Sequence, residues 1–273
     1  MDADVETMVR RLLSPLIAYL MQRGLGYIAL RDLLKKIYVE EALGRHNAED
    51  APTDSSISLV TGINRREVKR LRDDALQTRR TETRDPMAGV NMAARVVATW
   101  VSAPAFLDAE GEPTHLGTRG SDPEPNFDSL LRAAKVDVRA RTVIEELHRA
   151  GIVERDDEDR LYLLRAAFTP GTPQDKMLFL AANVSDHLRS GLHNLEPGNR
   201  PFIERALFHN AMTDAQLEAV RPMLSEMADR MLRRANAKLL DSSPPPESEA
   251  AGQPLKRLRL GVYYYETSTE DQV

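Results

Sequence analysis

The stretch ISLVTGINRREVKRL, residues 57–71, constrains the fold of this chain more than any other segment. Gly62 separates two short runs with helical spacing, and a left-handed backbone angle at a tight turn is open to glycine without strain. Ser58 is small enough to let a second helix approach the first. Apolar residues are spaced to pack both helices on one core: Ile57, Ile63, Val68 and Leu71. The segment therefore predicts a helix-turn-helix that begins at Asp54.

The helix after the turn is expected to begin at Asn64 and to carry a basic outer face. Asn64 is a suitable N-cap, and Glu67 follows three residues later, as in a capping box. The residues predicted to face outward are Asn64, Arg65, Arg66, Lys69 and Arg70. Between positions 62 and 84, eight Lys/Arg stand against four Asp/Glu, a local net charge of +4 in a chain of −5. Because arginine and lysine bind phosphate and arginine contacts guanine in the major groove, this helix predicts binding to double-stranded DNA.

Charge runs on helices usually face water, so a second interpretation stays open. Under it, the basic helix is a solvated face or meets an acidic partner, and the protein is an adaptor or oligomerisation scaffold without DNA binding. The leading hypothesis is a sequence-specific DNA-binding protein that regulates transcription.

Composition and motifs exclude several other classes of protein. The chain has no cysteine, which excludes disulfides, cysteine-ligated metals and thiol catalysis. The six histidines include no pair with the four-residue spacing of a helical zinc site, and no nucleotide-binding or hydrolase motif is present. We therefore predict no enzyme activity, no catalytic residue, no metal site and no cofactor.

The termini and hydropathy predict a cytoplasmic protein. The chain opens with MDADVE, which is acidic where a signal peptide needs positive charge. No apolar run approaches the ~18 to 20 residues of a membrane helix, so no membrane association is expected.

Periodicity predicts a mainly α fold, built from tandem helix-turn-helix or winged-helix modules with a C-terminal helical region and small β-hairpins. The first domain covers residues 1–85. A winged-helix-like domain covers 90–170, where FLDAEGEPTHL predicts a hairpin and the order of helix, helix and hairpin follows from position 127 to 164. Its final hairpin, 154–160, holds five acids and two arginines, a net charge of −3. Because phosphates would repel that hairpin, this domain is expected to dimerise or support structure rather than to contact DNA.

The remainder of the chain is predicted to be a helical region, a linker and a strand. Residues 172–240 are helical, with Leu178, Leu188 and Leu192 on one stripe. The Pro- and Ser-rich segment 241–254 has the composition of a disordered linker. In 255–273, KRLRLGVYYYE alternates like a strand, which should join a sheet edge, in its own chain or in a second one, because a lone strand is unstable. The apolar helical faces exceed the needs of one small bundle, so a homodimer is expected.

The segment NVSDHLRSGLHNL offers a further alternative, a pocket for a small-molecule effector. Its polar groups Asn183, His187 and Asn194 could line such a pocket, and packing in a helical dimer interface is the competing interpretation.

The order of motifs also resembles a known group of sequences. The first half is similar to bacterial helix-turn-helix regulators. The succession of VEEALG, SLVTGINRREVKRL, FLDAEGEP, DVRARTVIEELHRAGIVE, NVSDHLRSGLHNL and LGVYYYE resembles an uncharacterised bacterial family, a domain of unknown function, over nearly the full length. The resemblance implies a shared architecture and a bacterial origin, and it brings no known activity.

Overall fold

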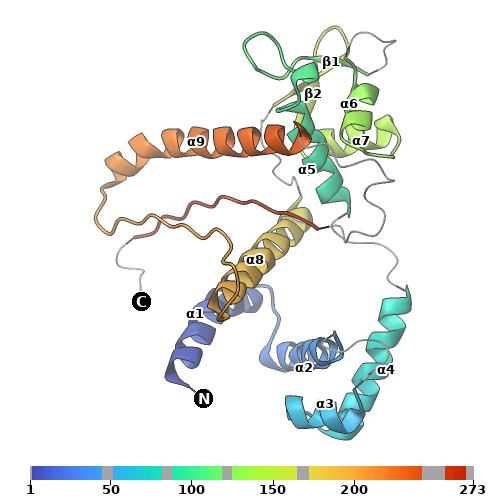
Figure 1. Cartoon of the computed structure of the whole chain (residues 1–273), viewed down its shortest axis with the longest axis vertical. Coiled ribbons are helices and arrows are strands. Elements are labelled where there is room, and N and C mark those ends of the chain that lie inside the picture. The colour runs from blue at the N-terminus through green and yellow to red at the C-terminus, as the bar shows by residue number, and fades with distance from the viewer. Residues whose placement is uncertain are drawn as a thin grey trace. The chain divides into compact units, whose positions relative to one another are not determined.

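The fold is mainly helical with one small antiparallel sheet, as the computed structural model shows (Figure 1). The structure describes residues 2–44, 52–81, 88–118, 125–164, 172–241 and 256–268. Contacts divide the chain into two compact units, Met1–Asp85 and Pro86–Val273. Each unit is described separately below.

The first unit contains four helices, of which three form a common core. They are α1 (Ala3–Gln22), α2 (Tyr27–Gly44), α3 (Asp54–Thr61) and α4 (Arg65–Thr81). Helices α2, α3 and α4 contact one another in all three pairs. Their buried residues are Val39, Ile57, Val68 and Leu71. The predicted pair of helices around Gly62 is confirmed.

Two local features of the sequence predict interruptions in this unit. Because Pro15 lacks an amide donor, it predicts a kink or a restart in the first helix; α1 continues through it from Ala3 to Gln22, so no restart occurs. The charged segment TRRTETRD, residues 78–85, is predicted from the sequence to be a linker, and this is wrong for 78–81, where α4 continues to Thr81. Arginine favours helix and neither glycine nor proline interrupts that stretch, so charge alone did not end the helix.

The second unit begins with a compact α/β body. Its elements are α5 (Ala88–Trp100), a short 3₁₀ turn (Pro104–Phe106), β1 (Leu116–Gly117), α6 (Phe127–Ala133), α7 (Ala140–Arg149), β2 (Val153–Arg155) and β3 (Arg160–Leu163). The sheet has the order β1-β3-β2, and both pairs are antiparallel. Leu116 lies opposite Leu161, and Val153 lies opposite Leu163.

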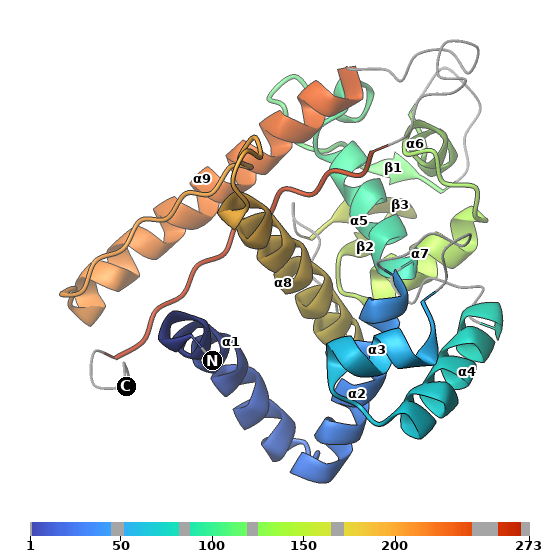
Figure 2. The same cartoon turned by 60° about the horizontal axis from the view of Figure 1, so that its bottom comes forward.

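The core of this body surrounds a single tryptophan. Trp100 meets Phe127 edge to face, with ring centroids 6.0 Å apart. Its indole Nε1–H donates to the carbonyl oxygen of Thr114 at 3.0 Å, so the buried polar atom is satisfied. In Figure 2, α5, α6 and α7 lie around the small sheet. The predicted order of helix, helix and hairpin from position 127 to 164 is confirmed.

The predicted hairpin in FLDAEGEPTHL is confirmed in a minimal form. Leu107 and Pro113 make an isolated antiparallel bridge. The carboxylate of Asp108 accepts from the backbone N–H groups of Glu110 and Glu112, and this holds the turn.

Two long helices follow, α8 (Pro173–Leu195) and α9 (Asp214–Asp241), as predicted. The end of α9 packs on α5, where the Asn236 side chain donates to the carbonyl oxygen of Ala98 at 2.8 Å and contacts the Ser102 hydroxyl at 2.5 Å. Apart from Asp241, the predicted disordered linker, 241–254, lies outside the described residues.

The C-terminal segment, described over residues 256–268, is extended but joins no sheet in the described part of the chain (Figure 2). The prediction that it joins a sheet edge of its own chain is therefore wrong there, while addition to a sheet of a second copy stays a prediction. Side chains hold it instead: Arg257 makes two hydrogen bonds to the carboxylate of Asp186 on α8, at 3.0 and 2.6 Å. Arg259 contacts the same carboxylate at 2.8 Å and Asn183 Oδ1 at 2.7 Å. Alternation correctly indicated extended backbone, but side-chain pairing with a helix replaces the strand ladder.

Candidate nucleic-acid interface

The turn between α3 and α4 has the backbone geometry expected from its glycine. Gly62 is left-handed, with φ 70° and ψ 5°, and its N–H donates to the Ser58 carbonyl oxygen at 2.9 Å. The Ser58 hydroxyl donates to the carbonyl oxygen of Ile63 at 2.7 Å. No atom lies within 4 Å of the place where a Cβ on Gly62 would stand. The backbone angle, rather than space, therefore selects glycine.

Asn64 starts α4 as a cap. Its Oδ1 accepts from the backbone N–H of Arg66 at 2.9 Å. The predicted capping box is wrong, because Glu67 does not turn back to Asn64. Its carboxylate accepts from Lys35 Nζ of α2, with distances of 2.9 and 3.0 Å. This contact fixes α4 to α2, and no local pattern predicts it because the partner lies 32 residues away.

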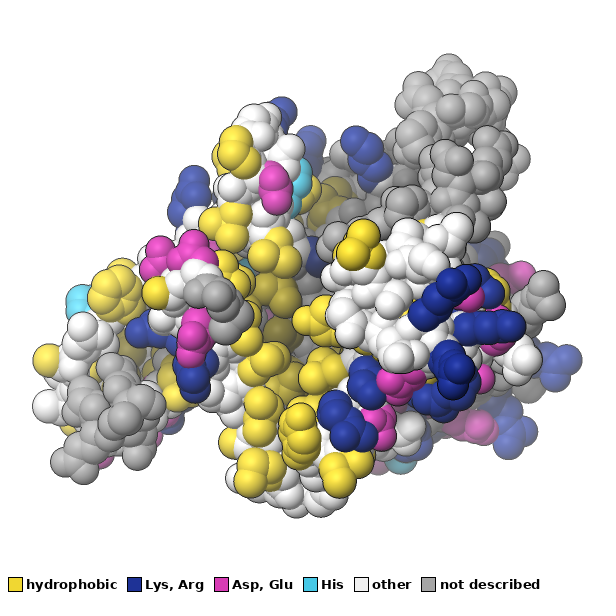
Figure 3. Space-filling view, turned by 90° about the horizontal axis from the view of Figure 1, so that it is seen from below, with side chains coloured by type: hydrophobic (Ala, Val, Ile, Leu, Met, Phe, Trp, Pro, Cys, Tyr) yellow, Lys and Arg dark blue, Asp and Glu magenta, His cyan; other side chains and the backbone are white. Residues whose placement is uncertain are grey.

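Helix α4 has one buried face and one exposed basic face. Val68, Leu71 and Ala75 are buried. All the residues predicted to meet DNA are exposed: Asn64, Arg65, Arg66, Lys69 and Arg70. Figure 3, which views the molecule from below, shows Lys and Arg side chains gathered where α3 and α4 lie. The fold therefore brings these predicted site residues together.

The positive charge is concentrated in the first two turns of α4. Residues 65–70 hold four basic side chains and one acid, Glu67, whose carboxylate lies 2.9 Å from Lys35 Nζ and 3.8 Å from Arg70 Nη2. Arg72 belongs to a different contact, since its Nη1 lies 2.6 Å from Asp54 Oδ1 at the start of α3. Exposed Asp73 comes next along the helix. Recognition helices contact base edges through their N-terminal residues, which matches this distribution of charge.

The acidic hairpin of the second unit neutralises its own arginines. Arg155 pairs with Asp159, while Arg160 contacts Asp156 at 2.9 Å and Glu158 at 3.0 Å. The His115 side chain, 2.8 Å from Asp156, and hydrogen bonds from Arg160 hold the pKa of the Asp156 carboxyl well below its usual range. These contacts leave the hairpin with its net negative charge and no arginine directed to a phosphate.

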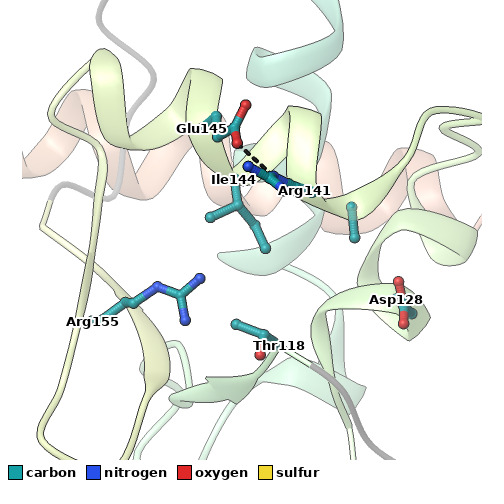
Figure 4. Close-up of a pocket in the computed structure, with 7 residues that line it drawn as sticks. Thr118, Asp128, Arg141, Ile144, Glu145 and Arg155 are labelled. Atoms are coloured by element: carbon teal, nitrogen blue, oxygen red, sulfur yellow. Dashed lines mark hydrogen bonds and ion pairs between the residues drawn. The ribbon is translucent and has the colours of Figure 1, made fainter.

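A shallow pocket lies beside the same hairpin, between α7 and the sheet (Figure 4). Arg155 points into it and Ile144 lines its opposite side. Arg141 at its rim pairs with Glu145 at 2.8 Å. Both arginines already have carboxylate partners. An anion in the pocket would therefore compete with these carboxylates for each arginine.

The polar groups of α8 that could line an effector pocket serve the chain's own segments instead. Asn183 accepts from Arg259, and the His187 ring lies 5.8 Å from that of Tyr263. Asn194 makes hydrogen bonds with the backbone N–H of Phe202 and with the Glu204 carboxylate. The structure does not bring these three groups together around one cavity.

The described part of the chain carries neither a metal-binding cluster nor a helix that could cross a membrane. Among those residues, no group of three or more His, Cys, Asp or Glu side chains is placed to hold a metal ion. None of the helices described is long and apolar enough to cross a bilayer.

These features define the class of protein: it is a mainly helical chain with an exposed basic helix. Residues 3–271 match a family of unknown function, DUF6502, and the chain belongs to that family. No curated protein and no solved structure matches the chain.

Proposed function

We propose that the protein binds double-stranded DNA through α4 and regulates transcription. The single observation that supports this proposal is the exposed basic face of α4, positioned opposite a buried apolar face. Helices α3 and α4 then act as a helix-turn-helix, with the first two turns of α4 in the major groove. Arg65, Arg66, Lys69 and Arg70 supply contacts to phosphates and base edges.

The charges of the second unit support a role for it that differs from that of the first unit. In our proposal its helices and strands, α5, β1, α6, α7, β2 and β3, form a winged helix, and the hairpin in the position of the wing is acidic. Acidic side chains next to a duplex weaken binding, so this unit contacts protein rather than DNA in our proposal.

The test compares duplex binding by the full chain and by Arg66→Ala/Lys69→Ala at two salt concentrations. The native protein should lose affinity steeply as salt rises, because each phosphate contact releases counterions. The double variant should bind more weakly at low salt, and its slope of log affinity against log salt should fall by about 2.

A matched control removes two positive charges elsewhere in the first unit. Arg11 on α1 and Lys36 on α2 are both exposed, so Arg11→Ala/Lys36→Ala changes the net charge equally. The control should keep most of the native slope. Equal effects of the two double variants would show that binding depends on overall charge, and unchanged binding in the α4 variant would favour the adaptor.

A further inference from the structure

Helix α8 exposes a continuous apolar stripe. Six large side chains on it are between 40% and 70% exposed: Met177, Leu180, Val184, Leu188, Leu192 and Leu195. Their steps of three and four residues put them on one face of a helix. The charged residues of α8 all lie off this stripe: Asp175, Lys176, Asp186 and Arg189.

The opposite face of α8 is occupied by the chain itself. Asp186 is about half a turn from the stripe at ~100° per residue, and it binds Arg257 and Arg259 of the C-terminal segment. Asn194 binds the segment that follows α8. The first contact holds α8 by its polar side. Asn194 is about 100° from the centre of the stripe, so the second contact lies at the edge of the stripe. The six side chains of the stripe remain at least 40% exposed.

The spacing of the stripe is symmetric about position 186. The successive steps are three, four, four, four and three residues. When a second copy of the helix runs antiparallel, 177 lies opposite 195, 180 opposite 192, and 184 opposite 188. A two-fold interface requires this reciprocity, in which residue i meets residue j and residue j meets residue i.

The exposed apolar surface is also large enough for a stable contact. Ten large apolar side chains of residues 177–208 are at least 40% exposed: the six of the stripe with Phe202, Ile203, Leu207 and Phe208. Burying a fully exposed large apolar side chain removes on the order of 60 to 120 Å². These ten are exposed by about 60% on average, so together they offer roughly 400 to 700 Å². A standard interface takes about 800 Å² from each partner, a little over half of it apolar.

We propose that a second copy of this chain covers the stripe, with the two α8 helices antiparallel about an axis at position 186. The pairs 177–195, 180–192 and 184–188 then form the centre of a homodimer. The rival occupant is α1 of the same chain, whose apolar side chains are exposed as well. A covering α1 would leave the protein monomeric.

The test uses cysteine cross-linking, because the native chain has no cysteine. The full chain is made as Leu180→Cys and as Leu192→Cys, with tags of different size, and each is oxidised alone and after co-expression. In the proposed register, each cysteine is about 18 Å along the axis from its own copy, beyond the reach of a disulfide. The two different cysteines face each other, so only the co-expressed pair should give a mixed disulfide dimer.

Each other result overturns the proposal. Disulfide dimers of either variant alone would show a parallel arrangement. A monomeric mass by light scattering at micromolar concentration, with no cross-link, would assign the stripe to α1 or to solvent. A dimeric mass without the mixed disulfide would place the interface elsewhere.

A second variant tests the stripe without oxidation. Val184→Glu/Leu188→Glu puts four carboxylates at the centre of the proposed interface, and it should shift the mass from dimer to monomer. Glu218→Ala/Glu226→Ala on α9 controls for altered surface charge and should leave the dimer intact. A dimer that persists in the α8 variant would contradict the proposal, provided circular dichroism shows native helicity.

Discussion

Gly62 is the residue on which the geometry of the α3–α4 turn depends. A side chain there meets no neighbour, so replacing it changes only the backbone energy. We expect Gly62→Ala to lower the free energy of unfolding of the first unit by about 1 to 2 kcal/mol, and Gly62→Asn to cost less, because asparagine visits left-handed angles more readily. Urea unfolding followed by circular dichroism measures both. Equal stability of all three proteins would contradict the turn as described.

Asp156 gives the second unit a dependence on pH. Its depressed pKa, caused first by the His115 side chain and then by Arg160, means that the folded state favours the ionised carboxylate. The resulting stability is present above the ordinary aspartate value of 3.8 and is lost as the pH falls below it. Carboxyl titration by NMR should show a midpoint well below 3.8 that rises in His115→Ala. A native midpoint near 3.8 would refute the contact.

Single residues were predictable from the sequence where their partners are close in the chain. Gly62, Val68 and Leu71 act within one turn and one helix pair, so spacing alone identified them. Glu67 was assigned incorrectly and the partners of Asp186 were not predicted, because Lys35 and the arginines of the C-terminal segment are 32 and 71 or more residues distant. A local rule assigned Glu67 to a cap, and the long-range ion pair took its place.

At the scale of elements, one carboxylate of α8 holds the first part of the C-terminal segment, and Glu266 further along it pairs with Arg221 of α9 at 2.6 Å. Trypsin needs a free arginine or lysine side chain, and Asp186 holds both Arg257 and Arg259. We therefore expect Asp186→Ala to raise the rate of tryptic cleavage after these arginines several-fold, as measured by mass spectrometry. Glu226→Ala, which removes an acid paired only within α9 among the described contacts, should not. Equal cleavage rates would show that these ion pairs do not hold the segment.

Element types were easier to predict than their neighbours. Helical periodicity identified every long helix, but the stripe of α8 was assigned with Leu178, which is half-buried and lies off the exposed face. The register of that face becomes clear only when the segments on its polar side are known. For the same reason, alternation in KRLRLGVYYYE could not distinguish a sheet strand from an extended segment bound to a helix.

At the scale of the whole molecule, the two surfaces used in our proposals, the basic face of α4 and the apolar stripe of α8, belong to different units. The exposed cations of α4 lie in Met1–Asp85, and the α8 stripe lies in Pro86–Val273. The residues that contact nucleic acid in our proposal are therefore separate from those that contact a second copy of the chain. Changes in one unit can therefore be tested for effects on DNA binding and on self-association independently.

The symmetric spacing on α8 has a consequence for the nucleotide sequence that the protein would select. A pair of chains related by a two-fold axis presents two α4 helices related by the same axis. Operators bound by such pairs are inverted repeats, because each half-site meets an identical helix from the opposite direction. Sequencing of genomic fragments retained by the native protein should yield palindromic sites, and Val184→Glu/Leu188→Glu should retain fragments with single half-sites at best.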